Sequence, residues 1–199
     1  MNRAKLRRVY AFWAPVYNAL YERFYRGLRV ESIAHLKLQP DDAVLIIGAG
    51  TGSDFDLLAG SRIIAVDAST SMLKRSRKRA KRNRVEVLLA DGEELPFRDE
   101  TFDAAVLHLV LTVTPVPQAL LAETGRVLRV GGRVAVCDHF APPPAASGVR
   151  RAVSPLTELL GARLDRTFEQ MAQGLPFVIT RDDWRTKRSY RLLQLRREP

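Results

Sequence analysis

Five short apolar runs recur along the chain, and polar or glycine-containing segments separate them. They cover residues 43–48, 62–67, 85–91, 102–110 and 132–138. Continuous apolar runs of this length are typical of strands that are buried on both faces, as in a parallel sheet. The pattern therefore predicts five buried strands.

Segments with helical signals lie between these strands. We expect helices over residues 51–58 and 117–128, and the glycine pair at 131–132 would stop the second one. A further helix would start at the Ser-Thr capping candidates of positions 69–70 and run through Met72. Strands that alternate with helices predict a mainly parallel sheet.

Past the fifth strand the alternation ends. Residues 141–148 (APPPAASG) are expected to form a linker or hinge, and residues 149–164 a helix. Residues 177–180 and 189–196 would close the sheet as an antiparallel pair. The sequence thus predicts an α/β fold: a mainly parallel seven-stranded sheet with helices on both faces and an antiparallel C-terminal strand pair.

Composition is consistent with one folded domain. A chain of 199 residues with 46% hydrophobic content can bury a substantial core. The single Cys137 excludes an internal disulfide, and the N-terminus lacks the apolar run of a secretory signal, so a cytoplasmic location is expected. Residues 104–122 carry no charge, but Pro115 and Pro117 favour a strand, a loop and a helix start over a membrane span.

The net charge of +10 is concentrated in two segments. Residues 1–30 contain seven Lys or Arg and one acid, and residues 74–84 contain eight basic residues and no acid. Such clustering indicates an anionic partner surface, either lipid or nucleic acid. For the second segment, a solvated helix surface is the alternative.

Candidate binding residues stand where the predicted strands end, which is where open α/β sheets bind their ligands. The Gly-Ala-Gly-Thr-Gly loop of residues 48–52 would allow a tight turn and close backbone approach, although Ser53 breaks the dinucleotide-binding spacing. Asp67 ends the second strand, where a carboxylate can accept hydrogen bonds from both hydroxyls of a ribose. Asp91 ends the third strand and is placed to meet an adenine amino group.

Four segments, VLIIGAGTG, AVDAST, ADGEELPF and RVLRVGGRVAV, resemble the successive motifs of class I S-adenosylmethionine-dependent methyltransferases. The resemblance implies a Rossmann-like fold and S-adenosylmethionine as cofactor, with S-adenosylhomocysteine as product. No metal is expected, because the three histidines show no ligand spacing. The cofactor contacts implied are Gly48, Ala49, Gly50, Gly52, Asp67, Ala68, Met72, Asp91, Gly92, Glu93 and His108.

Further segments, YAFWAPVYNALY, LTVTPVPQALLAETGRVLRVGGRVAVCDHF and SPLTELLGARLD, are similar to bacterial phospholipid N-methyltransferases, which methylate phosphatidylethanolamine. Quinone C-methyltransferases share several of these features, so a quinone or another small acceptor stays open. An RNA-binding methyltransferase or another nucleic-acid binder that uses residues 74–84 is a third interpretation. Against it, this segment holds no aromatic residue for base stacking.

The chain departs from the family pattern at two positions. Ile47 stands where the family usually has an acidic residue that supports the methionine end of the cofactor, so Asp54 or a reorganised loop would have to substitute. Asn18 stands where the N-terminal motif often carries an aspartate.

The expected chemistry needs few special residues, because the sulfonium is already an activated methyl donor. Orientation of the reacting groups alone can contribute roughly 7–11 kcal/mol. A primary ammonium has to lose a proton before it attacks, and His139, Asp138 and Tyr17 are the candidates to accept or relay it. His108 lies inside the fourth predicted strand, so a cofactor contact or a core position is favoured over catalysis.

The N-terminal segment, residues 1–30, is expected to be an amphipathic lid or membrane-binding unit, and residues 31–199 the methyltransferase domain. An apolar stripe at helical spacing is bordered by basic residues, as suits a bilayer interface. An anionic membrane surface and a phospholipid substrate are therefore the expected partners, with peripheral membrane association. The candidate substrate or membrane contacts are Arg7, Arg8, Tyr10, Trp13, Tyr17 and Tyr21.

Overall fold

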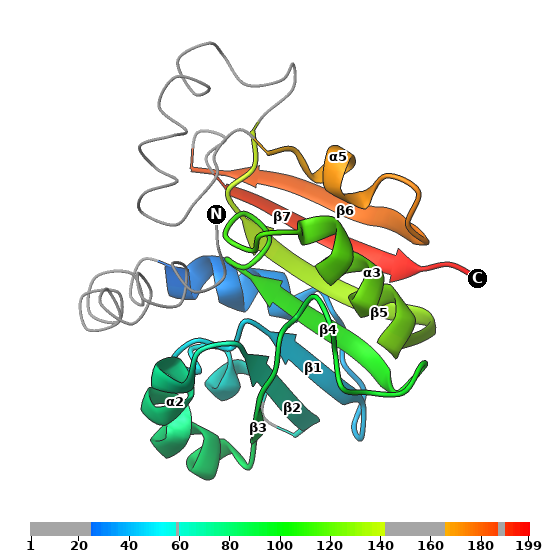
Figure 1. Ribbon diagram of the computed structural model, residues 1–199. Helices are drawn as coiled ribbons and strands as arrows, with labels where there is room; N and C mark the ends of the chain where they lie inside the picture. Colours follow the sequence, from blue (N-terminus) through cyan, green and yellow to red (C-terminus); the bar gives the residue numbers. More distant parts are fainter. Residues whose placement is uncertain (1–24, 59, 142–165, 187–189) are drawn as a thin grey trace.

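The computed structural model describes residues 25–58, 60–141, 166–186 and 190–199, and a single sheet forms its centre (Figure 1). The strand order is β3-β2-β1-β4-β5-β7-β6. Strands β1 to β5 run parallel, and β7 is antiparallel to both β5 and β6. The expected seven-stranded sheet with an antiparallel C-terminal pair is confirmed. The strands are β1 (Ala43–Ile47), β2 (Arg62–Asp67), β3 (Glu86–Leu89), β4 (Phe102–His108), β5 (Leu128–Asp138), β6 (Phe177–Arg185) and β7 (Tyr190–Arg197).

Helices cover both faces of the sheet. Successive side chains of a strand point to opposite faces, so a buried strand contributes to the apolar core on each side. In β1, Leu45 and Ile47 pack into one apolar core together with α3 (Pro117–Val127) and α5 (Phe168–Ala172). Val44 and Ile46 belong to a second core on the other face, where the helix of residues 25–34 and α2 (Thr70–Asn83) pack. Every residue of β1 is buried, as its uninterrupted apolar pattern predicts.

Helix α2 begins as the sequence predicts. Ser69 has extended backbone geometry, and its hydroxyl accepts a hydrogen bond from the backbone N–H of Met72. The helix ends at Arg84, whose φ of 55° is left-handed. Helix α2 therefore connects the end of β2 to the start of β3.

The helix expected over residues 51–58 is wrong. Only one 3₁₀ turn, η1 (Phe55–Leu57), forms there. Gly50 and Gly52 have φ values of 55° and 82°, which are incompatible with a right-handed helix. A Cβ on Gly52 would lie 2.6 Å from the ring of Phe55, so this turn requires a glycine at position 52.

The start of β5 also differs from the expectation. The strand was expected over residues 132–138 but begins at Leu128, before the glycine pair. Leu128 is fully buried and pairs with Phe102, and the register then shifts before Ala104 pairs with Arg133. Gly131, with φ 80°, absorbs this irregularity, so the glycines form a kink within the strand.

Several expected features fall outside the described residues, namely the apolar stripe of the N-terminal segment, the linker at 142–148 and the helix expected over 149–164. The helix of residues 25–34 continues through residue 30, where the boundary between the two units was expected. No helix in the described part of the chain is long and apolar enough to cross a membrane.

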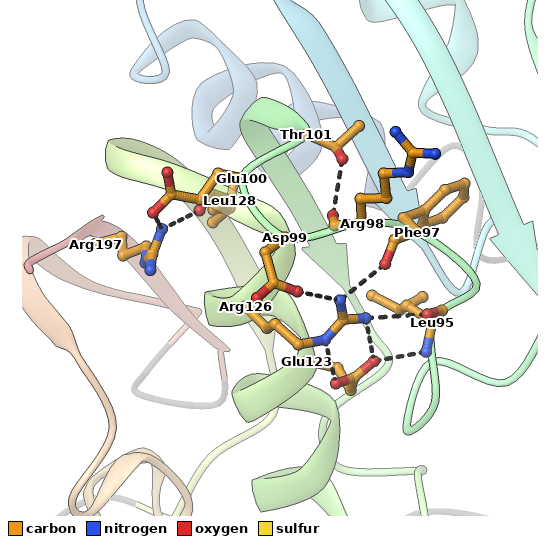
Figure 2. Close-up of polar contacts among 10 residues, drawn as sticks. All are labelled: Leu95, Phe97, Arg98, Asp99, Glu100, Thr101, Glu123, Arg126, Leu128 and Arg197. Atoms are coloured by element: carbon orange, nitrogen blue, oxygen red, sulfur yellow. Dashed lines mark hydrogen bonds and ion pairs between the residues drawn. The ribbon is translucent and has the colours of Figure 1, made fainter.

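Arg126 of α3 joins this helix to the segment that enters β4 (Figure 2). Its guanidinium donates two hydrogen bonds to Glu123, at 2.7 and 2.8 Å, and one to Asp99 at 2.7 Å. It also donates to the carbonyl oxygens of Leu95 and Phe97. These carboxylates raise the pKa of Arg126, and Arg126 in turn lowers the pKa of Glu123.

We expect Arg126→Ala to lower the free energy of unfolding by about 2 kcal/mol, since charge-assisted bonds are lost and two carbonyl groups lose a partner. Arg129→Ala is the matched control, because Arg129 makes a more exposed ion pair with Asp103 and should cost less than about 1 kcal/mol. Urea unfolding of both variants measures the difference. Equal losses would show that the Arg126 network adds nothing beyond a surface pair.

Candidate active site

A pocket of about 330 Å³ opens at the carboxyl ends of β1, β2 and β4. The glycine loop after β1, the end of β2, the first turn of α2 and the loop after β4 form its walls. Gly52 and Glu93 do not line it, although the family resemblance implied both. The residues implied as cofactor contacts that do line it are Gly48, Ala49, Gly50, Asp67, Ala68, Met72, Asp91, Gly92 and His108.

The glycine loop turns tightly against β2. The backbone N–H groups of Gly48 and Ala49 both donate to the carbonyl oxygen of Val66 at 2.9 Å. Gly48 has φ 76°, and a Cβ there would lie 2.7 Å from Cγ2 of Val110. Only glycine satisfies both the backbone conformation and the close approach of the loop after β4.

The carboxylate of Asp67 bridges the two segments that flank it. Its oxygens accept from the backbone N–H of Gly50 at 2.7 Å and from that of Ser69 at 2.8 Å. Burial raises the pKa of Asp67, and the two backbone hydrogen bonds oppose that rise. The carboxylate is thus held at the wall of the pocket between the glycine loop and α2.

The turn after β3 brings Asp91 and Gly92 to the pocket. Asp91 accepts a hydrogen bond from the backbone N–H of Glu93 at 3.0 Å, which tightens the turn. A Cβ on Gly92 would lie 2.7 Å from Cγ2 of Ile47 and 3.0 Å from Cδ1 of Leu120. The apolar side chain of Ile47 therefore packs against this turn, in the position where an acid was expected.

Asp54 lies at the centre of a buried polar cluster behind the pocket wall. Its carboxylate accepts from Nη1 of Arg29 at 2.6 Å and from Nδ1 of His108 at 2.8 Å. Because a carboxylate can only accept, Nδ1 of His108 carries the hydrogen, and Nε2 lies 3.1 Å from the hydroxyl of Ser32. Burial raises the pKa of Asp54, but Arg29 and His108 outweigh it and hold that pKa well below its usual range.

The position of Asp54 bears on whether it replaces the acidic residue that the family usually has at position 47. Asp54 is 3% exposed and does not line the pocket, whereas Arg29 and His108 do. The carboxylate therefore positions two pocket-lining side chains and does not enter the pocket in place of an acid at position 47. The sequence analysis counted Arg29 only among the basic residues of the N-terminal segment, and no motif marked it as a pocket residue, because its partner is 25 residues away.

Two buried acids hold the loop that follows β4. The carboxylate of Asp138, which is fully buried, accepts from the backbone N–H groups of Leu111 and Thr112 and from the hydroxyl of Thr112. Glu93 accepts from the hydroxyl of Thr114 at 2.7 Å and from the backbone N–H of Val116. Both acids therefore have a positioning role in this structure.

The same loop carries backbone strain. Leu109, which lines the pocket, has φ 57°, an uncommon value for a residue with a branched side chain. Arg166 reinforces the loop by donating to the carbonyl oxygens of Leu111, Thr114 and Pro115. Hydrogen bonds on several sides thus fix a strained segment beside the pocket.

His139 lies outside the pocket lining, next to Tyr190. Its ring centroid is 3.9 Å from that of Tyr190, and the hydroxyl of Tyr190 is hydrogen-bonded to that of Tyr25. We call Tyr25, His139 and Tyr190 the tyrosine–histidine cluster. Tyr17 and the other N-terminal candidates lie outside the described residues.

Comparison with known proteins identifies the family. Residues 45–136 match the model of a methyltransferase domain. Over 170 residues, the chain is 30% identical to phosphatidylethanolamine N-methyltransferase of Cereibacter sphaeroides, and the match spans 82% of this chain and 83% of that enzyme. The chain belongs to the class I S-adenosylmethionine-dependent methyltransferases. It is therefore a methyltransferase with a Rossmann-like fold that uses S-adenosylmethionine.

Other methyltransferases are also similar. The chain is 34% identical over 162 residues to demethylmenaquinone methyltransferase of Thermobifida fusca. That match covers 79% of this chain and 61% of that enzyme. Geranyl diphosphate C-methyltransferase of Streptomyces coelicolor, solved with S-adenosyl-L-homocysteine, shares the fold with a TM-score of 0.73 at 17% identity. That match covers 86% of this chain and 75% of the other.

We expect Asp54→Ala to lower the free energy of unfolding by about 3–5 kcal/mol at neutral pH, because it removes the buried carboxylate that binds Arg29 and His108. The lowered pKa of Asp54 makes its contribution complete above the unfolded-state value near 4 and lost as the pH falls below it. The gap between wild type and variant should therefore narrow below pH 4.

Urea unfolding at pH 7 and in acid measures this gap. Asp56→Ala is the matched control, because the more exposed Asp56 pairs with Arg82 and should cost less than about 1 kcal/mol. A gap that stays constant with pH would contradict the assignment of the ionised carboxylate to this cluster.

Proposed function

We propose that this methyltransferase N-methylates the amine of phosphatidylethanolamine at a membrane surface, toward phosphatidylcholine. The match with the Cereibacter sphaeroides enzyme carries the proposal, since it extends over 83% of that protein. The demethylmenaquinone methyltransferase of Thermobifida fusca shows a slightly higher identity, but 61% of its length is covered. Methylation of a quinone carbon is accordingly the second candidate.

The pocket fits the cofactor of the family. Its glycine loop leaves backbone groups uncovered by side chains, and Asp67 and Asp91 both line the pocket. When bound, S-adenosylmethionine supplies an activated methyl group. In the proposal, Asp67 accepts the ribose hydroxyls, Asp91 accepts from the adenine amino group, and Arg29 and His108 face the remaining polar part.

The tyrosine–histidine cluster would serve the acceptor. An amine needs a base close to it, and His139 follows the end of β5, on the same sheet edge as the pocket. Its ring is held against Tyr190, which fixes its orientation. His139 is thus the proposed proton acceptor, whereas the four hydrogen bonds that Asp138 accepts favour a positioning role for that residue.

Membrane association is part of the proposal. The aromatic and basic composition of residues 1–30 favours an interfacial segment, and basic groups near an anionic leaflet contribute about 1 kcal/mol each before screening. We infer a peripherally bound enzyme that meets its phospholipid substrate at the bilayer surface.

The deciding experiment offers the purified enzyme labelled S-adenosylmethionine together with separate pools of phosphatidylethanolamine, demethylated quinone and RNA. Label in the phospholipid supports the proposal, and label in the quinone pool selects the second candidate. Label in RNA alone would overturn both.

The carboxylate of Asp67 gives a test of the cofactor site. We expect Asp67→Ala to weaken S-adenosylhomocysteine binding by about 10- to 150-fold, which corresponds to 1.5–3 kcal/mol for a charge-assisted hydrogen bond. Calorimetry measures the affinity. Asp103→Ala, at the amino end of β4 and away from the pocket, is the control and should bind normally. An unchanged affinity in folded Asp67→Ala would remove this residue from the site.

His139 can be tested with two substitutions. His139→Ala should lower turnover about 100-fold or more while cofactor affinity changes little, as expected for a positioned base. His139→Phe retains a ring against Tyr190 but cannot accept a proton, so it should be equally slow. Normal turnover of His139→Phe would assign His139 a packing role only.

A further inference from the structure

The exposed face of α2 is strongly cationic. Residues 74–84 contain seven exposed basic side chains. Within the described residues, the only ion pair that these seven make joins Arg82 to Asp56. The buried side of the helix, with Met72, Ser76 and Ala80, faces the sheet. The exposed basic residues are Lys74, Arg75, Arg77, Lys78, Lys81, Arg82 and Arg84.

Two exposed leucines lie on the strand beside this helix. Strand β3 is an edge strand and contacts α2 (Figure 1). Leu88 and Leu89 of β3 are 39% and 56% exposed. Leu89 lies on the same face of the sheet as Val87, which packs in the core beneath α2, whereas Leu88 points to the opposite face. Leu89 pairs in register with Asp67, so it lies toward the pocket end of the sheet. We call the seven basic residues and Leu89 the α2–β3 surface.

The α2–β3 surface adjoins the cofactor pocket. Ser69 and Met72, at the start of α2, line the pocket, and the basic residues begin two positions later with Lys74. Ala90 and Asp91, directly after the leucines, line it too. A partner that covers this surface therefore lies next to the site of methyl transfer.

The chemistry of the surface favours a lipid bilayer over other anionic partners. No aromatic side chain accompanies the cations of residues 74–84, so base stacking has no platform there. A second copy of the chain would bring like charges together. Cations next to an exposed aliphatic side chain match an anionic headgroup layer above acyl chains.

We propose that the α2–β3 surface is a second membrane contact, separate from residues 1–30, which docks the enzyme on bilayers that contain anionic phospholipid. The inference rests on the proposed function, because a lipid acceptor makes a bilayer the relevant partner. The contact holds the pocket beside the headgroup layer, so the anionic lipid content of the bilayer controls how fast the enzyme methylates its lipid substrate.

The test is flotation of the full chain with vesicles of phosphatidylcholine containing phosphatidylglycerol. The variant Lys74→Glu/Lys78→Glu/Lys81→Glu should bind about 100-fold more weakly at low salt, because each basic group near the leaflet contributes about fivefold. The loss should shrink as added salt screens the charges. The variant Leu89→Thr should bind more weakly at every salt concentration.

A matched control changes the net charge equally at the other end of the sheet. Lys37→Glu/Arg62→Glu/Arg98→Glu alters three exposed residues that lie away from the pocket. It should bind these vesicles nearly as wild type does. If the control and the α2 variant lose binding equally, or if the α2 variant binds like wild type, the surface is not a membrane contact. Loss of binding to a single-stranded RNA with unchanged vesicle binding would likewise overturn the proposal.

Methylation of phosphatidylethanolamine in neutral detergent micelles separates this inference from the proposed function. The α2 variant should act normally in micelles and slowly on anionic vesicles. If wild type methylates no phosphatidylethanolamine in either form, the proposed function fails, whereas the vesicle-binding comparison still decides the docking surface.

Discussion

The pocket depends on two backbone positions that carry no side chain. Gly48 and Gly92 each lie so close to a neighbouring apolar side chain that a Cβ would approach it to 2.7 Å. The carboxyl end of β1 can therefore approach the loop after β4, and the turn after β3 can approach β1 and α3, while a cavity stays open between these segments. The other features of the site hold these closely spaced segments in place.

Acidic side chains do most of this holding. Asp67 joins the glycine loop to α2, Asp138 and Glu93 fix the loop after β4, and Asp54 fixes Arg29 and His108. Buried carboxylates accept several hydrogen bonds each and so satisfy backbone N–H groups that no strand or helix pairs. The strain of Leu109 is tolerated for the same reason, because its surroundings leave the loop no alternative conformation.

The sheet could be predicted from the sequence because uninterrupted apolar runs are typical of strands buried on both faces. The burial expected for the third run is wrong, since β3 forms an edge of the sheet and is largely exposed. The pocket-lining glycines and Asp67 were also predictable, since they stand where such strands end. The buried cluster of Asp54 was not, because its partners lie 25 and 54 residues away and no local pattern joins them. The segment 51–58 was mispredicted because left-handed glycines decide its backbone.

We infer that residues outside the matched methyltransferase domain contribute to the choice of acceptor. That domain ends at residue 136 and, among the described residues, contains all that line the pocket except Arg29. Methyltransferases with different acceptors, a phospholipid amine in one relative and demethylmenaquinone in another, both match this chain. A match to this domain therefore does not by itself identify the acceptor. The tyrosine–histidine cluster draws all its members from beyond that domain, and its helix of residues 25–34 also supplies Arg29 to the pocket. This helix thus physically links the cofactor pocket to the cluster that we assign to the acceptor.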